Sequence, residues 1–108
     1  KLTEAVPALA GELHVTGGRA ALRTASQDRF PVIGQVPDID AWASGQKRFV
    51  EGLYVSTGHG SHGIISSLAG AHLLTDMITG SPLSQPDKVV DALSPARFLK
   101  RMERRGEL

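Results

Sequence analysis

Three glycines at the spacing Gly58-x-Gly60-x-x-Gly63 form the strongest chemical signal in this sequence. Glycine lets a backbone approach a ligand closely, and the first turn of a helix offers free N–H groups and the positive end of a dipole. Together these features suit a phosphate or another electron-rich group. A simpler interpretation also fits the pattern, a tight turn that packs a strand closely against a helix.

Histidines stand beside these glycines, and a second pair of ligand-type residues follows. His59 and His62 lie in the loop, and His72 and Asp76 are four residues apart, a spacing at which two helical side chains can bind one metal ion. The two pairs do not converge in an obvious way, so polar loop residues and a solvated helix face are favoured over a metal site. Ser61 lacks the G-x-S-x-G context of a hydrolase nucleophile.

Arginines supply two further candidate sites. Arg23 ends an apolar stretch, where a guanidinium can hold a carboxylate in bidentate fashion. The C-terminal segment gathers basic residues that could contact nucleic-acid phosphates, namely Arg97, Lys100, Arg101, Arg104 and Arg105. The simpler interpretations are an exposed arginine at a strand end and a solvated helix face whose cations favour the C-terminal dipole.

The elements that must position the glycine loop are predicted from hydrophobic patterning. Residues 49–57 concentrate β-branched and aromatic side chains, which predicts a strand. Residues 64–79 place apolar side chains at spacings of three and four, which predicts a helix that Gly80 and Pro82 end. Only residues 89–90 could begin a second strand, so the strand–helix–strand unit of a dinucleotide site is incomplete.

A β-hairpin is predicted in the first part of the chain. Residues 12–16 alternate polar and apolar side chains, Gly17-Gly18 interrupt the pattern, and residues 19–24 resume it. Residues 1–10 allow only a short helix or a turn because of Pro7.

The other segments are predicted from turn and capping residues. Residues 30–34 are expected as a short extended piece, at an edge or irregular position because it contains a proline. Residues 36–46 are expected as a surface excursion, and residues 81–91 as a proline-punctuated connector. Ser94 and Pro95 predict the start of a last helix that runs to about Arg105.

Length and composition bound the class of protein. The chain has 108 residues, no cysteine and a net charge of +1, which excludes disulfides and cysteine nucleophiles and gives no global attraction to nucleic acid or membrane. No apolar run approaches the ~18 residues that span a bilayer. The length permits a core, and the lack of cysteine fits a reducing, cytoplasmic compartment. The first residue is not methionine, which suggests a processed product or a piece of a longer chain.

Two blocks of sequence carry a family resemblance. Residues 21–34 are ALRTASQDRFPVIG and residues 52–64 are GLYVSTGHGSHGI. In this order they resemble the C-terminal end of flavoproteins of the D-amino-acid oxidase and glycine oxidase family, in which an L-R, D-x-x-P-x-I-G stretch precedes N/G-L-Y-V-x-x-G-H and a long apolar helix. Residues 18–29 and 91–98 are similar to the oxidoreductase half of the bifunctional, tRNA-modifying members.

The resemblance implies a fold and an activity. The fold would be an α/β (α+β) fragment in which residues 1–108 form the C-terminal portion of an FAD-binding Rossmann-like domain, with strands from the substrate domain. The activity would be that of an FAD-dependent oxidoreductase acting on CH–NH groups. It would remove the carboxymethyl group from carboxymethylaminomethyl-uridine at the wobble position of tRNA, with tRNA as partner and no membrane.

Site residues follow from the same resemblance. The loop and the helix start would face the flavin, which assigns cofactor binding to Gly58, His59, Gly60, Ser61, His62, Gly63 and Ile64. Arg23 matches the arginine that binds the substrate carboxylate, and no residue is assigned to catalysis or to a metal. Relatives often carry arginine at the position of Ser61 or of His62.

The resemblance also sets expectations for the isolated chain. Because the dinucleotide fingerprint of these flavoproteins is not in this sequence, we expect the chain alone to be inactive and to bind FAD weakly or not at all. Apolar faces that a missing sheet would cover are expected to cause self-association. The alternative is a small α/β RNA- or protein-binding module that uses the basic C-terminal helix.

Overall fold

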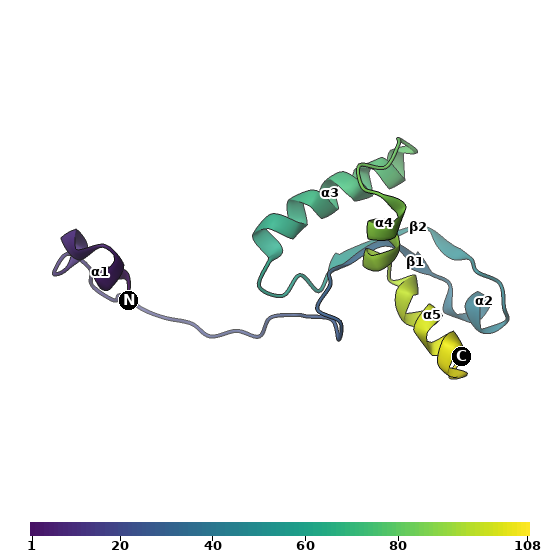
Figure 1. Ribbon diagram of the computed structural model, residues 1–108, viewed down its shortest axis with the longest axis horizontal. Helices are drawn as coiled ribbons and strands as arrows, with labels where there is room; N and C mark the ends of the chain where they lie inside the picture. Colours follow the sequence, from purple (N-terminus) through teal and green to yellow (C-terminus); the bar gives the residue numbers. More distant parts are fainter.

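A computed structural model describes residues 1–108 (Figure 1). The chain has five α-helices and one small antiparallel sheet, which is the α+β content expected of such a fragment. In chain order the elements are α1 (Leu2–Ala5), the 3-10 helix η1 (Pro7–Leu9), β1 (Val32–Pro37), α2 (Ile39–Ala43), β2 (Phe49–Thr57), α3 (Gly63–Thr79), α4 (Asp87–Leu93) and α5 (Ala96–Arg105). No helix is long and apolar enough to cross a membrane.

The sheet pairs β1 with β2 in antiparallel register. Val32 lies opposite Thr57 and Gln35 opposite Tyr54, and the register shifts before Pro37, a residue that has no N–H to donate. The predicted strand over residues 49–57 is confirmed with the same bounds, and the predicted extended piece is the start of β1. The sheet therefore holds the strand that leads directly into the glycine loop.

Helix α3 confirms the predicted apolar helix and ends where the sequence indicates. Gly80 adopts a left-handed conformation with φ 69°, and its N–H donates to the Asp76 carbonyl. The helix approaches the sheet at Gly70, where an added Cβ would lie 2.8 Å from Ile33 Cδ1. Leu73, one turn later, is fully buried.

The segment predicted as a surface excursion, residues 36–46, contains a helix and part of the core, so that prediction is wrong. Asp38 caps α2 by accepting a hydrogen bond from the Ala41 N–H at 3.1 Å. Trp42 is buried, donates from Nε1 to the Arg48 carbonyl at 2.9 Å, and forms the core cluster with Ala96 and Leu99. The tryptophan is buried because α5, distant in sequence, packs against it.

The C-terminal part is more helical than predicted. The expected connector over residues 81–91 gives way to α4, so that prediction is wrong from Asp87 onward. The last helix is confirmed. Ser94 Oγ accepts from the Ala96 N–H at 3.2 Å, and Gly106, with φ 69°, ends α5 after Arg105.

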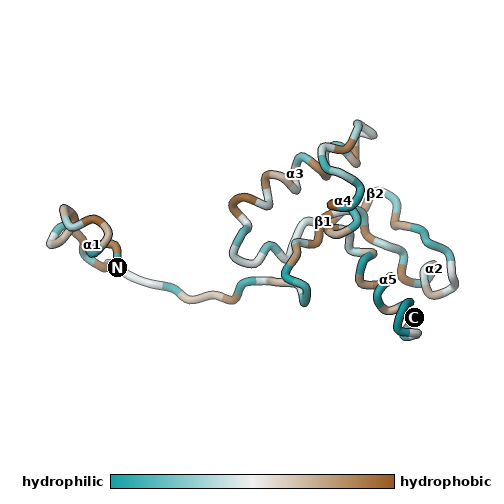
Figure 2. Tube along the Cα trace, viewed as in Figure 1, coloured by the Kyte–Doolittle hydropathy of each residue, from teal (hydrophilic) through white to brown (hydrophobic).

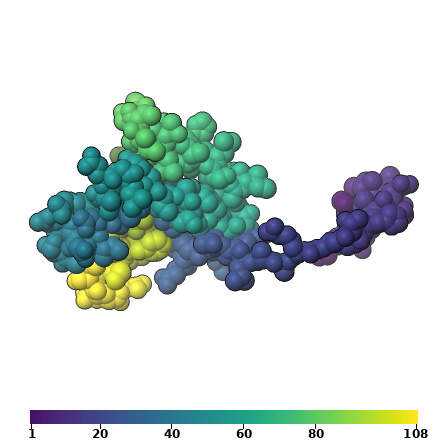
Figure 3. Space-filling model, turned by 180° about the vertical axis from the view of Figure 1, so that it is seen from behind, coloured from purple at the N-terminus to yellow at the C-terminus, as the bar shows by residue number.

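The predicted β-hairpin at residues 12–24 is wrong. This stretch contains no strand, and it forms an arm that carries α1 and η1 away from the rest of the molecule (Figures 1 and 3). A two-stranded hairpin is marginal without a third element to cover its apolar face, and nothing in the chain covers this one. Several apolar residues of the arm are exposed, and Figure 2 shows hydrophobic, brown segments along it.

The molecule is extended for its length. Its radius of gyration is 19.5 Å, whereas a compact domain of about 100 residues has a radius of about 13 Å. Only 11 of 108 residues are buried, which is a smaller core than the length permits.

Candidate functional site

The glycine loop connects β2 to α3 and needs glycine at two positions for conformational reasons. Gly58 and Gly60 have φ values of 69° and 58°, in the left-handed region that side chains other than glycine rarely adopt. The Gly60 N–H donates to the Thr24 carbonyl at 3.0 Å, and Ala25 forms a bridge with His59. The chain ahead of β1 therefore lies directly beside the loop.

His59 joins the end of β2 to the first turns of α3. Its Nδ1 lies 2.7 Å from Ser66 Oγ and its Nε2 lies 3.0 Å from Ser56 Oγ. Ser66 donates its one hydroxyl proton to the His62 carbonyl at 2.8 Å, so it accepts from the Nδ1–H of His59. A neutral His59 is thus protonated on Nδ1 and accepts from Ser56 at Nε2. Both ring nitrogens are engaged, which suits a positioning role for the loop.

A hollow of about 300 Å³ opens at the loop and at the start of α3. Its lining consists of Ala25, Arg29, His59, Gly60, Ser61 and His62. The backbone N–H groups of Ser61, Gly63 and Ile64 have no acceptor within the chain. Free N–H groups at a helix start attract electron density. The arrangement can therefore hold an electron-rich ring edge or an oxyanion.

Arg29 is a site residue that the sequence analysis did not single out. It is the only non-glycine residue with a positive φ, 64°, and its N–H donates to the Ser26 carbonyl at 3.1 Å. Its side chain forms no ion pair, and Arg29 lines the hollow together with residues of the glycine loop. The pairing of residues 24–25 with the loop brings Arg29 there, and because this contact is long-range, no local pattern could have indicated it.

Buried charges hold the turn that carries Arg29. Arg97 Nε and Nη2 donate to the two carboxylate oxygens of Asp28 at 2.8 and 2.9 Å. Arg101 Nη2 lies 2.7 Å from Asp28 Oδ2. The Arg97 guanidinium, opposed by burial and helped by Ser26, the Phe30 N–H and Arg101, holds the pKa of Asp28 far below its usual range.

Arg97 consequently does not belong to a solvated basic helix face. Its side chain is 6% exposed, and all five of its N–H donors have acceptors, the remaining ones being the carbonyl oxygens of Phe30, Leu93 and Ser94. The interpretation of residues 97–105 as one solvated surface is wrong at this position. The sequence could not show this because Asp28, the partner, lies 69 residues away.

The other predicted site residues lie apart from the hollow. Arg23 is exposed on the arm, two residues before the bridge at Ala25. His72 is exposed on α3, and the Asp76 carboxylate accepts from the Ser84 N–H at 2.9 Å. No group of three or more histidine, aspartate or glutamate side chains could hold a metal ion.

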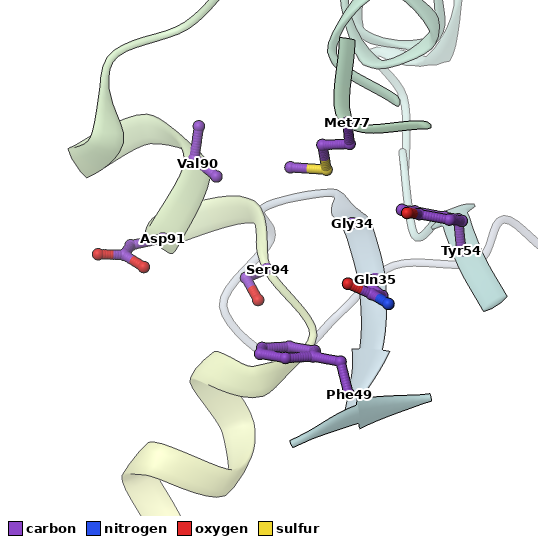
Figure 4. A pocket seen from close by; sticks show the side chains of 8 residues that line it. All are labelled: Gly34, Gln35, Phe49, Tyr54, Met77, Val90, Asp91 and Ser94. Atoms are coloured by element: carbon purple, nitrogen blue, oxygen red, sulfur yellow. The ribbon is translucent and has the colours of Figure 1, made fainter. Parts of the chain in front are cut away.

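A second hollow, of about 320 Å³, lies between the sheet and α4 (Figure 4). Met77 points from the end of α3 toward Val90 of α4, and Tyr54 enters from β2. Its acidic group, Asp91, lies 3.4 Å from Lys100 Nζ. Its polar side chains Tyr54, Asp91 and Ser94 form no hydrogen bond with one another, and the loop hollow, which has unpartnered backbone N–H groups beside it, is the stronger candidate site.

Comparison with known proteins finds relatives that share one name. Three relatives are named tRNA 5-methylaminomethyl-2-thiouridine biosynthesis bifunctional protein MnmC. The one from Campylobacter hominis is 30% identical over 108 residues, covering 87% of this chain and 16% of the relative. The one from Methylibium petroleiphilum is 41% identical over 92 residues, covering 75% and 14%. The one from Burkholderia thailandensis is 34% identical over 118 residues, covering 100% and 18%.

The chain thus spans less than a fifth of the length of these relatives. No solved structure matches it. The family described as FAD dependent oxidoreductase (DAO) matches residues 1–77, a stretch that includes the arm, both strands, the glycine loop and most of α3. With more than half of its residues matched, the chain belongs to the FAD dependent oxidoreductase (DAO) family.

Proposed function

We propose that residues 1–108 are the C-terminal part of a cytoplasmic, FAD-dependent amine oxidoreductase that acts on CH–NH groups in tRNA. Membership of the FAD dependent oxidoreductase family supports the redox chemistry. The names of the relatives, which concern the biosynthesis of a modified tRNA uridine, support the substrate class. The observation that carries the proposal is the hollow at the glycine loop, which Arg29 lines together with Ser61, whose backbone N–H has no acceptor within the chain.

The loop and the start of α3 would hold the flavin. The residues concerned are Gly58, His59, Gly60, Ser61, His62, Gly63 and Ile64. The unpartnered N–H groups of Ser61, Gly63 and Ile64 fit the electron-rich pyrimidine edge of a flavin ring. The glycines have no side chains to shield that backbone from a ligand. His59 holds the loop between β2 and α3 through its contacts with Ser56 and Ser66. FAD, when bound, supplies a two-electron acceptor.

The substrate would be the carboxymethylaminomethyl group of the wobble uridine. Oxidation of its C–N bond to an imine removes two electrons and two protons, and the addition of water then releases glyoxylate and the free aminomethyl nucleoside. Arg23 would hold the substrate carboxylate as a bidentate pair. Arg23 lies outside the loop hollow, two residues before the bridge that joins Ala25 to His59, and the role rests on its match to the carboxylate-binding arginine of the family.

A chimera tests the proposal. The matching segment of the Methylibium petroleiphilum relative is replaced by this chain, and the purified chimera is supplied with tRNA that contains carboxymethylaminomethyl-uridine. We expect flavin reduction and release of glyoxylate. Arg23→Ala should raise KM about tenfold or more with a smaller effect on kcat, because a charged hydrogen bond to bound substrate contributes about 1.5–3 kcal/mol.

Two controls define the result. Lys88→Ala removes an exposed cation of α4 that forms no ion pair and should leave KM unchanged. The 108-residue chain alone should show no turnover and no tight flavin absorbance, since it lacks the dinucleotide fingerprint. A folded chimera without flavin, or one that retains flavin but releases no glyoxylate, would contradict the proposal.

A further inference from the structure

Unpaired cations gather at the end of α5. A hollow of about 450 Å³ is lined by Arg101, Arg104 and Arg105 and by no other residue. Neither Arg104 nor Arg105 forms an ion pair, whereas the nearby cations Lys47 and Lys100 do. A hollow bounded only by guanidinium groups is suited to phosphate oxygens, because each group offers several donors in a fixed plane.

This end of α5 is connected to the candidate redox site through a single turn. Arg101 Nη2 contacts Asp28 Oδ2 at 2.7 Å, and the next residue, Arg29, lines the hollow at the glycine loop. Figure 1 shows this turn, just before β1, between the start of α3 and α5. Arg29, Arg101, Arg104 and Arg105 are termed here the cationic strip, because the Arg101–Asp28 contact links the C-terminal turn of α5 to the turn that carries Arg29.

Helix α5 and one arginine of the strip, Arg101, are held in place before any ligand arrives. Buried Arg97 anchors α5 to the turn, and the Arg101 guanidinium lies over the Phe98 ring, 5.7 Å from its centroid. Of the two acidic neighbours, Glu103 is engaged with Lys47 at 3.2 Å, and Glu107 lines a separate hollow with Arg101 and Arg105 without forming an ion pair. An arginine that is fixed in this way, as Arg101 is, loses less conformational entropy when it binds a phosphate.

We propose that the cationic strip binds the phosphate backbone of tRNA and leads the modified nucleotide into the hollow at the glycine loop. The choice of tRNA among polyanions rests on the proposed function. The contact itself is electrostatic and independent of base sequence. It adds a tRNA-binding role for residues outside the flavin loop.

Binding of fluorescein-labelled tRNA to the 108-residue chain, followed by fluorescence anisotropy across a salt series, tests the proposal. Arg104→Glu with Arg105→Glu should weaken binding about tenfold or more at low salt. Because each lost phosphate contact reduces the salt slope by about 0.7–0.9, the slope should fall by about 1–2. Arg29→Glu should weaken binding as well, and Arg104→Lys with Arg105→Lys should retain most of it.

The matched control is Lys1→Glu with Lys88→Glu, which makes the same change in net charge at two exposed cations outside the strip. Circular dichroism must show that each variant keeps its helical content. The proposal is overturned if wild-type chain does not bind tRNA, if the control weakens binding as much as the α5 variant, or if Arg29→Glu behaves like the control. The measurement needs no flavin, so its outcome is independent of whether the chimera oxidises amines.

Discussion

Asp28 and Arg97 show how a single ion pair can position a functional turn. The two side chains are 14% and 6% exposed, and their bidentate contact joins the turn ahead of β1 to the start of α5. Removing one partner of such a pair leaves an uncompensated buried charge, which costs about 3–5 kcal/mol. The pair therefore supports both the candidate hollow, through Arg29, and the cationic strip, through Arg101.

Asp28→Asn is expected to lower the stability of the chain by about 3 kcal/mol at neutral pH, because Arg97 then stays buried without a counter-charge. Chemical denaturation followed by circular dichroism measures the loss. Glu51→Gln, at an exposed position of β2 without an ion pair, should change stability by less than about 0.5 kcal/mol. A similar loss in both variants would contradict a specific role for the buried pair.

The depressed pKa of Asp28 also fixes the sign of the pH dependence. An unfolded aspartate has a pKa of about 3.9, so the stabilisation is fully present above that pH. It is lost as the pH falls from there toward the lower pKa of the folded state. The wild-type chain should lose stability below about pH 4, and Asp28→Asn should show a flatter profile over the same range.

At the scale of elements, the packing of α3 on the sheet depends on one glycine. Gly70 is buried, and an added Cβ would lie 2.8 Å from the end of the buried Ile33 side chain. The close approach sets the height of α3 above β1, and with it the position of the first turn of α3 at the glycine loop. A helix–sheet contact of this kind requires a small residue at its centre.

Gly70→Leu should destabilise the chain by about 1–3 kcal/mol, because the added side chain overpacks the contact with Ile33. Leucine favours helix over glycine, so any loss must come from packing. Ala71→Leu, at the next and exposed position, is the control and should change stability little. Urea unfolding measures both variants, and equal midpoints for Gly70→Leu and the wild-type chain would refute this packing argument.

At the scale of the whole molecule, the chain leaves much of its apolar surface uncovered. The stripe that predicts α3 mostly faces solvent, with Ile64 95%, Leu68 66% and Ile78 62% exposed. Leucines and isoleucines at helical spacing would ordinarily face a core. Contiguous exposed apolar surface of this kind favours association, in keeping with the expectation that the isolated chain self-associates.

Size-exclusion chromatography with light scattering should therefore find dimers or larger species of the 108-residue chain at about 100 µM, a concentration at which modest affinities of the order of 10 µM suffice. Leu68→Glu with Ile78→Glu should shift the chain toward monomer. Val15→Glu with Leu22→Glu makes the same change on the exposed arm and should have a smaller effect. A monomeric wild-type chain would argue against this prediction.

Local physics made much of the fold predictable. The strand over residues 49–57, the helix that ends at Gly80 and the helix that starts near Ser94 each depend on neighbouring side chains and on glycine or capping geometry. The order of strand, glycine loop and helix followed from the same signals. Family membership could also be predicted, because the two blocks that resemble the family, residues 21–34 and 52–64, are contiguous stretches of sequence.

The remaining features depend on partners that are distant along the chain. Trp42 is buried because α5 covers it, Arg97 is buried because Asp28 meets it, and Arg29 reaches the candidate site because residues 24–25 pair with the loop. Residues 12–24 and helix α3 do carry the apolar side chains that their patterns indicate. Whether those side chains are buried depends on whether another part of the chain packs against them. Sequence by itself determined the local elements and the family. Only the tertiary structure decided which charges are buried and which cations remain free, because burial and ion pairing depend on contacts between residues that are distant along the chain.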